Sequence, residues 1–396
     1  MKKIVIIGLL ALIVLSVWAF PKIKALNTTL TLFDEDKIVE NFRSVAEFWP
    51  TRSLTQAKVP YVYNYGEPLN VPSSFAYNDQ KLGSRQFLKD SWTTGLIVIQ
   101  NDEIALEDYY LGNSAVTQNI SWSMAKSFIS ALIGIAVNEG HIKSIEQSVD
   151  AYATSLGGSG YEGVSIKNVL QMSSGVAFNE DYGDFYSDIN RWGRDFSLGN
   201  SQDAFAATLK NDIEPGTVNH YVSINTHVLG MVLTQATGRS ITDYMQEKLY
   251  NPMGMEHDGL WIIDGQGMEM ALGGLNLTLR DFAKLGSLYL HDGTFNGQQI
   301  VPASWVADSR TMDQPHLLPG NDFGYGYQWW MVGGDSGEFM AMGVYGQYIY
   351  INPETNTVIV KNSANPFYND TSYIPSSDFA HLALFRALSA ATAKWI

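Results

Sequence analysis

The chain has 396 residues, of which 45% are apolar, and a formal net charge of −15 at pH 7. This length allows one large domain or two ordinary ones with a sizeable core, whereas the acidic balance argues against nucleic acid as a partner, because nucleic acids bind basic surfaces. The absence of cysteine excludes disulfides, thiol catalysis, iron–sulfur clusters and a lipid-modified N-terminal cysteine.

The N-terminus has the pattern of a leader segment. Lys2 and Lys3 precede an apolar run over residues 4–20. A short basic stretch before such a run is typical of a secretory signal peptide or of an uncleaved signal anchor. We therefore expect residues 1–26 to direct export to the periplasm or another extracytoplasmic space, in a cleaved or a membrane-anchored form. The membrane is expected to meet the protein only through this segment.

The next part of the chain leads from loops into a hairpin and a helix. Residues 21 to about 90 contain scattered prolines and aromatic residues, which predict a loop-rich segment that wraps the domain. Residues 96–99 and 104–110 predict two strands around a polar turn, which is a β-hairpin. Residues 120–140 then predict a helix that is apolar on nearly every face and is therefore expected to be buried on all sides.

The remaining pattern places helices in the middle of the chain and strands at its end. Helices are expected over residues 164–172, 203–209, 226–236, 241–249, 279–289 and 378–388, and strands over residues 338–345, 347–351 and 357–361. Strands near both ends predict an α/β (α+β) domain over residues 27–396. Its α/β part is expected over about 27–140 and 281–396, with an all-helical insertion over about 141–280.

Two polar side chains stand out at the start of the apolar helix. Ser123 and Lys126 are three residues apart and therefore lie side by side on one helix face. A serine becomes a nucleophile when a base takes its proton, and a lysine whose pKa is lowered by burial can be that base. The helix N-terminus also favours the negative charge that develops on attack. Alone, the pair is equally compatible with a serine cap and a solvated lysine.

Two further stretches contain possible partners of this pair. Tyr221 and Ser223 lie in a polar loop just before an apolar helix, and a tyrosine near a lysine cation is expected to have a lowered pKa, which would allow it to relay protons. Near the C-terminus, Gly343 and Gly346 interrupt an apolar strand pattern. Such glycines often mark a close approach, and a strand edge can offer a backbone N–H to an oxyanion hole. Alone, these stretches fit a surface tyrosine and an ordinary bulge.

Together these motifs resemble the penicillin-recognising serine hydrolases. The resemblance is closest to their class C β-lactamase-like branch and, within it, to the aminohexanoate-oligomer hydrolases and related esterases. The matching stretches are residues 123–126, 221–230, 271–278, 280–281 and 325–330. The resemblance covers the chain from about residue 95 to the C-terminus. It implies a β-lactamase/transpeptidase-like antiparallel sheet flanked by helices, with a helical insertion.

The resemblance also implies roles for individual residues. Ser123 would be the acylated nucleophile, Lys126 its base and Tyr221 the proton relay to the leaving group. Which of Lys126 and Tyr221 holds the proton at rest stays open, because coupled groups titrate as a pair. The oxyanion hole would be the backbone N–H groups of Ser123 and Gln347. The candidates for substrate contacts are Ser223, Tyr182, Trp329, Trp330, Tyr345 and Gly346. His220 is expected to be structural, and neither a metal nor a cofactor is implied.

Two departures from the family pattern bear on the substrate. β-Lactamases and cell-wall peptidases usually have Tyr-x-Asn, where this chain has Ser223, and Lys-Thr-Gly, where it has residues 344–346 as Val-Tyr-Gly. The missing lysine would bind a substrate carboxylate. The sequence therefore predicts a serine hydrolase that acts through an acyl-enzyme on small esters or linear amides. The alternatives are a β-lactamase or peptidoglycan DD-peptidase and, from another class, a non-hydrolysing penicillin-binding-type sensor.

Overall fold

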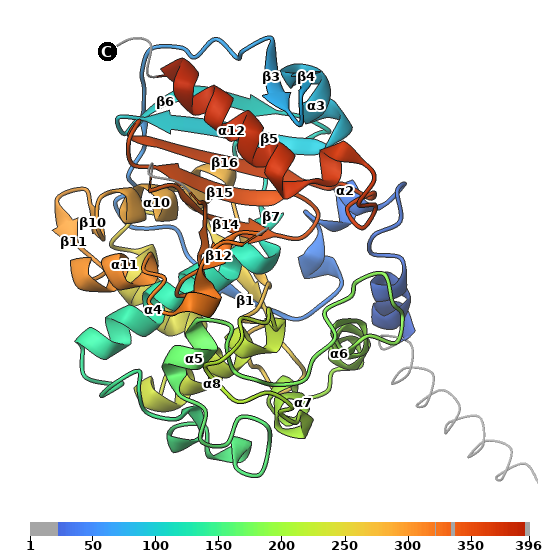
Figure 1. Ribbon diagram of the computed structural model, residues 1–396, viewed down its shortest axis with the longest axis vertical. Coiled ribbons are helices and arrows are strands. Elements are labelled where there is room, and N and C mark those ends of the chain that lie inside the picture. The colour runs from blue at the N-terminus through green and yellow to red at the C-terminus, as the bar shows by residue number, and fades with distance from the viewer. Residues whose placement is uncertain (1–22, 321, 334–336, 393–396) are drawn as a thin grey trace, which may run out of the picture.

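The structure is a computed structural model, and it describes residues 23–320, 322–333 and 337–392 (Figure 1). The apolar run over residues 4–20, on which the predicted leader depends, lies outside these residues. The described part begins with a helix over residues 23–30. None of the helices in the described part is long and apolar enough to span a bilayer.

Eight strands of the described chain form one large sheet in the order β12-β13-β14-β15-β16-β5-β6-β2. Their bounds are β2 Asn64–Tyr65, β5 Thr93–Gln100, β6 Glu103–Tyr109, β12 Gly324–Tyr325, β13 Trp330–Met331, β14 Phe339–Gly343, β15 Gln347–Asn352 and β16 Thr357–Ser363. The predicted hairpin is confirmed as β5 and β6, which pair antiparallel, and the predicted C-terminal strands are confirmed as β14, β15 and β16.

The two ends of the chain meet in the middle of this sheet. Strand β16 pairs antiparallel with β5, with Thr357 opposite Gln100. The turn between β5 and β6 has Asn101 and Asp102 at φ values of +49° and +63°. A two-residue hairpin turn requires this left-handed pair, which asparagine and aspartate tolerate. The structure therefore confirms the predicted α/β architecture, in which both terminal regions of the domain contribute to one sheet.

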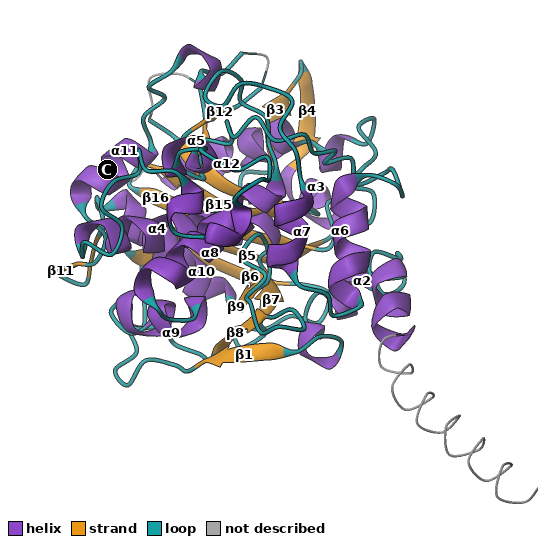
Figure 2. Ribbon diagram, turned by 90° about the horizontal axis from the view of Figure 1, so that it is seen from below, coloured by secondary structure: helices purple, strands orange, loops and turns teal. Residues whose placement is uncertain are grey.

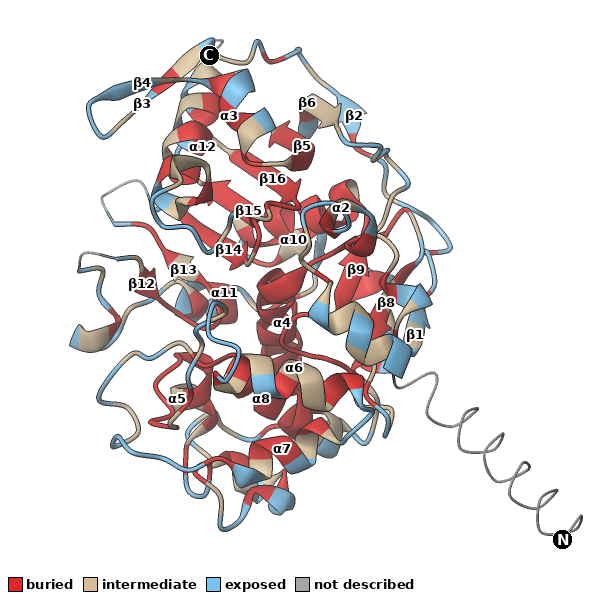
Figure 3. Cartoon of the chain, turned by 90° about the vertical axis from the view of Figure 1, so that its right-hand side faces the viewer, coloured by how far each residue is buried: buried red, intermediate tan, exposed pale blue. Residues whose placement is uncertain are grey.

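Helices cover both faces of the large sheet because both faces are apolar. On β5, Leu96 and Val98 pack on one side and Ile97 and Ile99 on the other, as the alternation of a strand requires. The first side packs against α3 Ser84–Asp90 and α12 Asp378–Thr392, and the second against α4 Ala125–Asn138 and α10 Leu279–Leu290. The strands are thus buried between two helical layers, and Figure 3 shows this core in red.

A helical part lies below the large sheet in Figures 1 and 3. Its helices are α5 Ile166–Leu170, α6 Asp188–Ser197, α7 Gln202–Thr208, α8 Ser223–Thr237 and α9 Ile241–Met245, the last continued by a π-helical turn at Gln246–Tyr250. All fall in the segment 141–280 that the sequence predicts as an insertion. The same segment also contributes the short strands β8 Gly259–Ile262 and β9 Leu275–Leu277. These pair in a smaller sheet, order β1-β8-β9-β7, with β1 Thr51–Leu54 and β7 Asn119–Ile120.

The remaining elements are short and lie around these layers, as Figure 2 shows from below. They are helices α2 Ile38–Asn41 and α11 Ala303–Ser309, the strand pairs β3 Ser74–Tyr77 with β4 Gln80–Gly83 and β10 Thr294–Phe295 with β11 Gln298–Gln299, and the 3-10 turns Val45–Glu47, Val149–Ala151, Thr154–Leu156, Pro315–Leu317 and Ile374–Ser376. Nearly half of residues 23–90 lies in loops and turns between such short pieces, so this segment is less rich in loops than the sequence predicted.

Helix α4 runs through the middle of the molecule, between the sheet and the helical part (Figure 3). All of its residues from Ala125 to Ala136 are buried, as the apolar pattern predicts. On one side α11 lies so close that a Cβ on Gly134 would be 2.4 Å from the Trp305 indole. On the other side it packs against α8. The start of α4 is therefore a rigid position for a functional group.

Candidate active site

Ser123 lies in a 3-10 turn, Trp122–Met124, that leads directly into α4. The preceding residue, Trp122, has a φ of +43°, a backbone conformation that residues other than glycine rarely adopt. Just before this turn, the Ser121 backbone N–H donates to the carbonyl of Leu275 at 2.8 Å. This hydrogen bond to β9 of the smaller sheet fixes the turn. Ser123 is 8% exposed at the N-terminal end of a buried helix.

Lys126 follows one turn later and is 2% exposed. Its Nζ donates to the carbonyl of Leu272 at 2.7 Å and lies 5.5 Å from the centroid of the Tyr221 ring. Burial lowers the pKa of Lys126 to about 7, although the negative charge of Glu180 opposes this shift. The ammonium is therefore partly deprotonated at neutral pH, as a general base must be.

Tyr221 lies just before α8, with its ring stacked on Trp330 at 5.2 Å between centroids. Burial raises the pKa of Tyr221, the charge of Glu180 raises it further, and contacts with the hydroxyls of Ser123 and Ser223 oppose the rise. The lowered pKa that the sequence predicted for Tyr221 is therefore wrong, because burial outweighs the nearby lysine. Tyr221 keeps its proton at neutral pH, whereas Lys126 titrates there. Environments that separate two pKa values in this way indicate which group is the acid and which the base.

Glu180 is a site residue that the sequence analysis did not identify. One carboxylate oxygen accepts hydrogen bonds from the Ser223 hydroxyl at 2.5 Å and the Tyr182 hydroxyl at 2.8 Å. The other accepts from the Ser223 backbone N–H at 2.9 Å. Glu180 thus fixes Ser223 and Tyr182 beside Tyr221. It lies in an irregular loop, where no periodicity or motif marks an acidic residue.

The strand beside Ser123 is β14, and its last residue, Gly343, makes the closest approach. A Cβ on Gly343 would lie 2.6 Å from the Ser121 carbonyl oxygen and 3.1 Å from the Ser123 nitrogen. The next residue, Val344, lines both cavities that reach Ser123. The backbone of Val344 is therefore placed to face the nucleophile.

Gln347, whose backbone N–H the resemblance implied as an oxyanion donor, lines neither of these cavities. Its buried side chain donates to the Ser363 carbonyl at 2.5 Å and accepts from Asn362 at 3.1 Å. The reason is the turn between the strands, where Tyr345 and Gly346 have φ values of +64° and +89°. This turn moves Gln347 to the start of β15, beneath the site.

The other predicted contact residues divide into cavity walls and core. Tyr182 lines both cavities and Trp330 lines one. Trp329, which immediately precedes β13, is instead fully buried against Tyr289, with 4.5 Å between the ring centroids. Tyr345 is also buried and stacks on Phe33. His220 is exposed and lines neither cavity.

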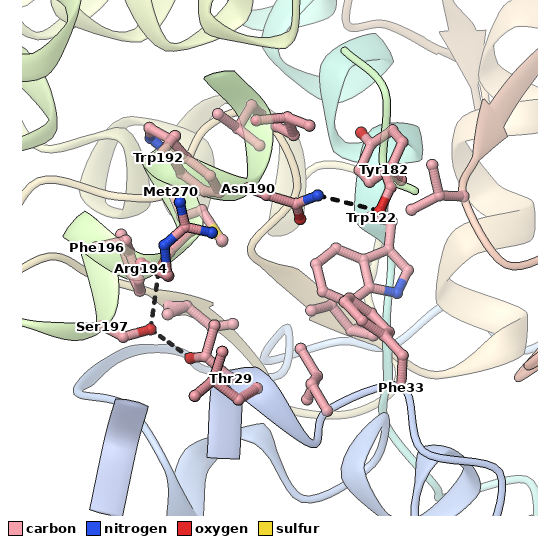
Figure 4. A pocket seen from close by; sticks show the side chains of 18 of the residues that line it. Thr29, Phe33, Trp122, Tyr182, Asn190, Trp192, Arg194, Phe196, Ser197 and Met270 are labelled. Carbon is pink, nitrogen blue, oxygen red and sulfur yellow. Dashed lines mark hydrogen bonds between the residues drawn. The ribbon is translucent and has the colours of Figure 1, made fainter. Parts of the chain in front are cut away.

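Two cavities meet at Ser123. The first, of about 290 Å³, extends between residues 29–33 and α6 (Figure 4). The second, of about 230 Å³, lies on the side of Tyr221, Trp330 and Glu180. Ser123, Tyr182 and Val344 line both. A carbonyl compound bound at Ser123 could thus place one substituent in each cavity.

Comparisons with known proteins agree with this geometry. Residues 86–372 match the Beta-lactamase family. A 6-aminohexanoate-dimer hydrolase from Paenarthrobacter ureafaciens is 28% identical over 295 residues, which cover 71% of this chain and 75% of that protein. A solved structure from Bacillus anthracis, provisionally given the same enzyme name, superposes with a TM-score of 0.80 at 22% identity, over 92% of this chain and 96% of its own. A family VIII carboxylesterase has a TM-score of 0.58 at 16% identity, over 78% and 95% of the two chains. The chain belongs to the Beta-lactamase family.

Proposed function

We propose that this protein is a serine hydrolase that cleaves small esters or linear amides through an acyl-enzyme at Ser123. The observation that carries the proposal is the contrast between Lys126, whose pKa lies at about 7, and Tyr221, whose pKa is raised. Both groups lie next to a serine at a helix N-terminus. A nucleophile, a base and an acid in separate protonation states are the set that acyl transfer needs.

In the first half-reaction, neutral Lys126 takes the proton of the Ser123 hydroxyl as its Oγ attacks the substrate carbonyl carbon. The backbone N–H groups of Ser123 and Val344 are the donors placed to stabilise the oxyanion. Tyr221 gives its proton to the leaving oxygen or nitrogen as that bond breaks, and it is reprotonated from Lys126. In the second half-reaction, water loses a proton to the base and attacks the ester carbon. The acid is released, and Ser123 recovers its proton.

The environment of β14 supports esters and linear amides over β-lactams. The residues of this strand that line the second cavity are Met342 and Gly343, followed by Val344. None of these supplies the cation that would bind the carboxylate of a β-lactam or a cell-wall peptide. The relative from Paenarthrobacter ureafaciens is named for the hydrolysis of a linear amide dimer, which agrees with this preference.

The test compares wild type with Ser123→Ala on p-nitrophenyl acetate, on a linear anilide and on nitrocefin. Hydrolysis of the ester or the anilide that disappears in the variant, with nitrocefin intact, supports the proposal. Rapid Ser123-dependent nitrocefin hydrolysis would assign a β-lactamase instead. A single burst of product without turnover, on every substrate, would assign a sensor that is acylated and not released.

We also propose that residues 1–26 direct export, on the basis of their basic and apolar pattern. Fractionation of cells that produce the full chain, with N-terminal sequencing of the mature protein, tests this. Protein in the cytoplasmic fraction with an intact N-terminus would contradict it.

A further inference from the structure

The cavity shown in Figure 4 begins at Ser123 and ends between the N-terminal region and α6. Leu32, Phe33 and Trp122 line its near part, and Trp192 and Phe196 of α6 line its far part. Its volume of about 290 Å³ has room for about ten groups of the size of a water molecule or a methylene.

Three polar side chains in this wall are already bonded to other parts of the protein, whereas the indole N–H groups of Trp49, Trp122 and Trp192, which also line it, have no hydrogen-bond partner among the described residues. The hydroxyls of Thr29 and Ser197 form a hydrogen bond with each other, drawn dashed in Figure 4. Asn190 donates to the backbone carbonyls of Tyr182 and Asp184 at 3.0 and 2.9 Å. These groups therefore offer little to a polar ligand.

The charge of the cavity lining comes from one side chain. Arg194 is the one charged side chain among the described residues that line the cavity, and none of them is aspartate, glutamate or lysine. Its guanidinium lies 4.0 Å from the centroid of the Phe185 ring and donates to the Phe185 carbonyl at 2.7 Å. An ammonium group in this cavity would lose its hydration without gaining a counter-ion.

The position of Tyr221 decides which part of a substrate enters this cavity. Tyr221 lines the second cavity and not the first. Because the leaving group must depart beside its proton donor, it occupies the second cavity. The acyl group that stays on Ser123 therefore extends into the first.

We propose that the first cavity is the acyl pocket and that it selects an unbranched acyl group of medium length, from hexanoyl to octanoyl, without a cationic end. This inference rests on the proposed function and adds the substrate class. The inference also predicts a different substrate from the one for which the Paenarthrobacter relative is named. A 6-aminohexanoyl group ends in an ammonium at neutral pH, and this cavity offers no counter-ion for it. Burial of each added methylene is expected to raise kcat/KM by about fourfold until the cavity is full.

The wall formed by the N-terminal region lies outside the part of the chain that matches the Beta-lactamase family. Thr29, Leu30, Leu32 and Phe33 line the cavity and precede residue 86, where the Beta-lactamase match begins. Phe33 stacks on Tyr345 with 4.3 Å between centroids and an interplanar angle of 13°. The wall is thereby joined to the turn that follows Val344.

Gly193 offers a way to shorten the cavity without disturbing the fold. It lies within α6 and lines the cavity, and a Cβ built on it would meet nothing within 4 Å. Replacement of a glycine in a helix by leucine or alanine favours the helix. Gly193→Leu is expected to fill the cavity, and Gly193→Ala is the matched control that leaves it largely open.

The experiment measures kcat/KM for p-nitrophenyl acetate, hexanoate, octanoate, palmitate and 6-aminohexanoate. For wild type we expect hexanoate and octanoate to exceed acetate by about a hundredfold or more, and hexanoate to exceed 6-aminohexanoate, which has the same length and an ammonium at its end. Gly193→Leu is expected to lower kcat/KM for octanoate far more than for acetate and so to remove the preference for octanoate, whereas the smaller Gly193→Ala should change the order of the substrates less. Acetate as the best substrate, 6-aminohexanoate equal to hexanoate, or an unchanged order in Gly193→Leu would each overturn the acyl-pocket assignment while Ser123-dependent hydrolysis still stands.

A second readout does not depend on turnover. Trp122 and Trp192 line the cavity, so methyl hexanoate bound to the Ser123→Ala variant is expected to change the tryptophan fluorescence, with weaker binding in the double variant with Gly193→Leu. If methyl hexanoate binds in this way but the wild-type protein hydrolyses none of the esters, the result contradicts the proposed function and supports the assignment of the pocket. The absence of both binding and hydrolysis would overturn both.

Discussion

Gly343 and Ser123 approach each other so closely that a Cβ on Gly343 would lie 3.1 Å from the Ser123 nitrogen. A real Cβ essentially never lies 2.6 Å from a backbone oxygen, which is the distance it would have to Ser121. Only glycine therefore allows β14 to bring the backbone of Val344 beside the nucleophile. The proposed oxyanion site therefore requires the absence of a side chain at this position.

Gly343→Ala is expected to lower kcat by about a hundredfold or more, since displacement of one oxyanion donor has an effect of this size. The fold should persist, because the strand retains its pairing with β15. Steady-state ester hydrolysis and circular dichroism measure the two effects. Gly320→Ala is the control, as a Cβ there meets nothing within 4 Å. Wild-type activity in Gly343→Ala would remove this strand from the catalytic site.

The pH dependence should report Lys126. Because the base must be neutral and its pKa is lowered to about 7, kcat/KM should rise by about tenfold for each pH unit below that value and level off above it. The raised pKa of Tyr221 keeps its proton in place across this range. A rise centred near the ordinary lysine value of 10.5 would show that Lys126 is not the base.

Glu180→Gln should move this pH profile. The Glu180 charge raises the pKa of Lys126, so its removal should lower that pKa and shift the acid limb to lower pH. Glutamine can still accept one of the hydrogen bonds from Ser223, which limits the structural effect. Glu214→Gln, at an exposed loop position, is the control and should leave the limb in place. A shift to higher pH would contradict the electrostatic role assigned to Glu180.

Lys126→Met should abolish hydrolysis and stabilise the fold. Burial lowers the pKa of Lys126 from 10.5 to about 7, so the unfolded chain binds its proton more tightly than the folded protein does. The destabilisation is greatest below pH 7, where the folded protein contains a buried ammonium, and it fades as the pH rises toward 10.5. At pH values below 7, the substitution should therefore raise Tm by several degrees, and near about pH 10 the increase in Tm should be smaller. An exposed substitution such as Lys81→Met should show no such trend. A lower Tm at every pH would mean that the hydrogen bond to Leu272 outweighs the cost of burying the charge.

The sequence by itself determined the scaffold of the site. The apolar pattern around Ser123 and Lys126 predicted a helix buried on all sides, because apolar side chains fall on nearly every face of this helix. The hairpin at residues 96–110 and the C-terminal strands followed from the alternation of apolar residues, which is a local property of the chain. The order of these elements predicted the α/β architecture, and the spaced motifs predicted the family.

Only the tertiary structure decided how the site is completed. Val344 rather than Gln347 lines the cavities that reach Ser123, because the left-handed turn at Tyr345 and Gly346 leads the chain into β15 before Gln347. Glu180 joins Ser223 through contacts between distant loops, which no local pattern records. The acyl cavity is closed by residues 29–33 packed near α6. Local periodicity specifies which face of an element is buried, but the packing of elements far apart in the chain decides which side chains meet, and that packing depends on the shapes of all the surfaces in contact.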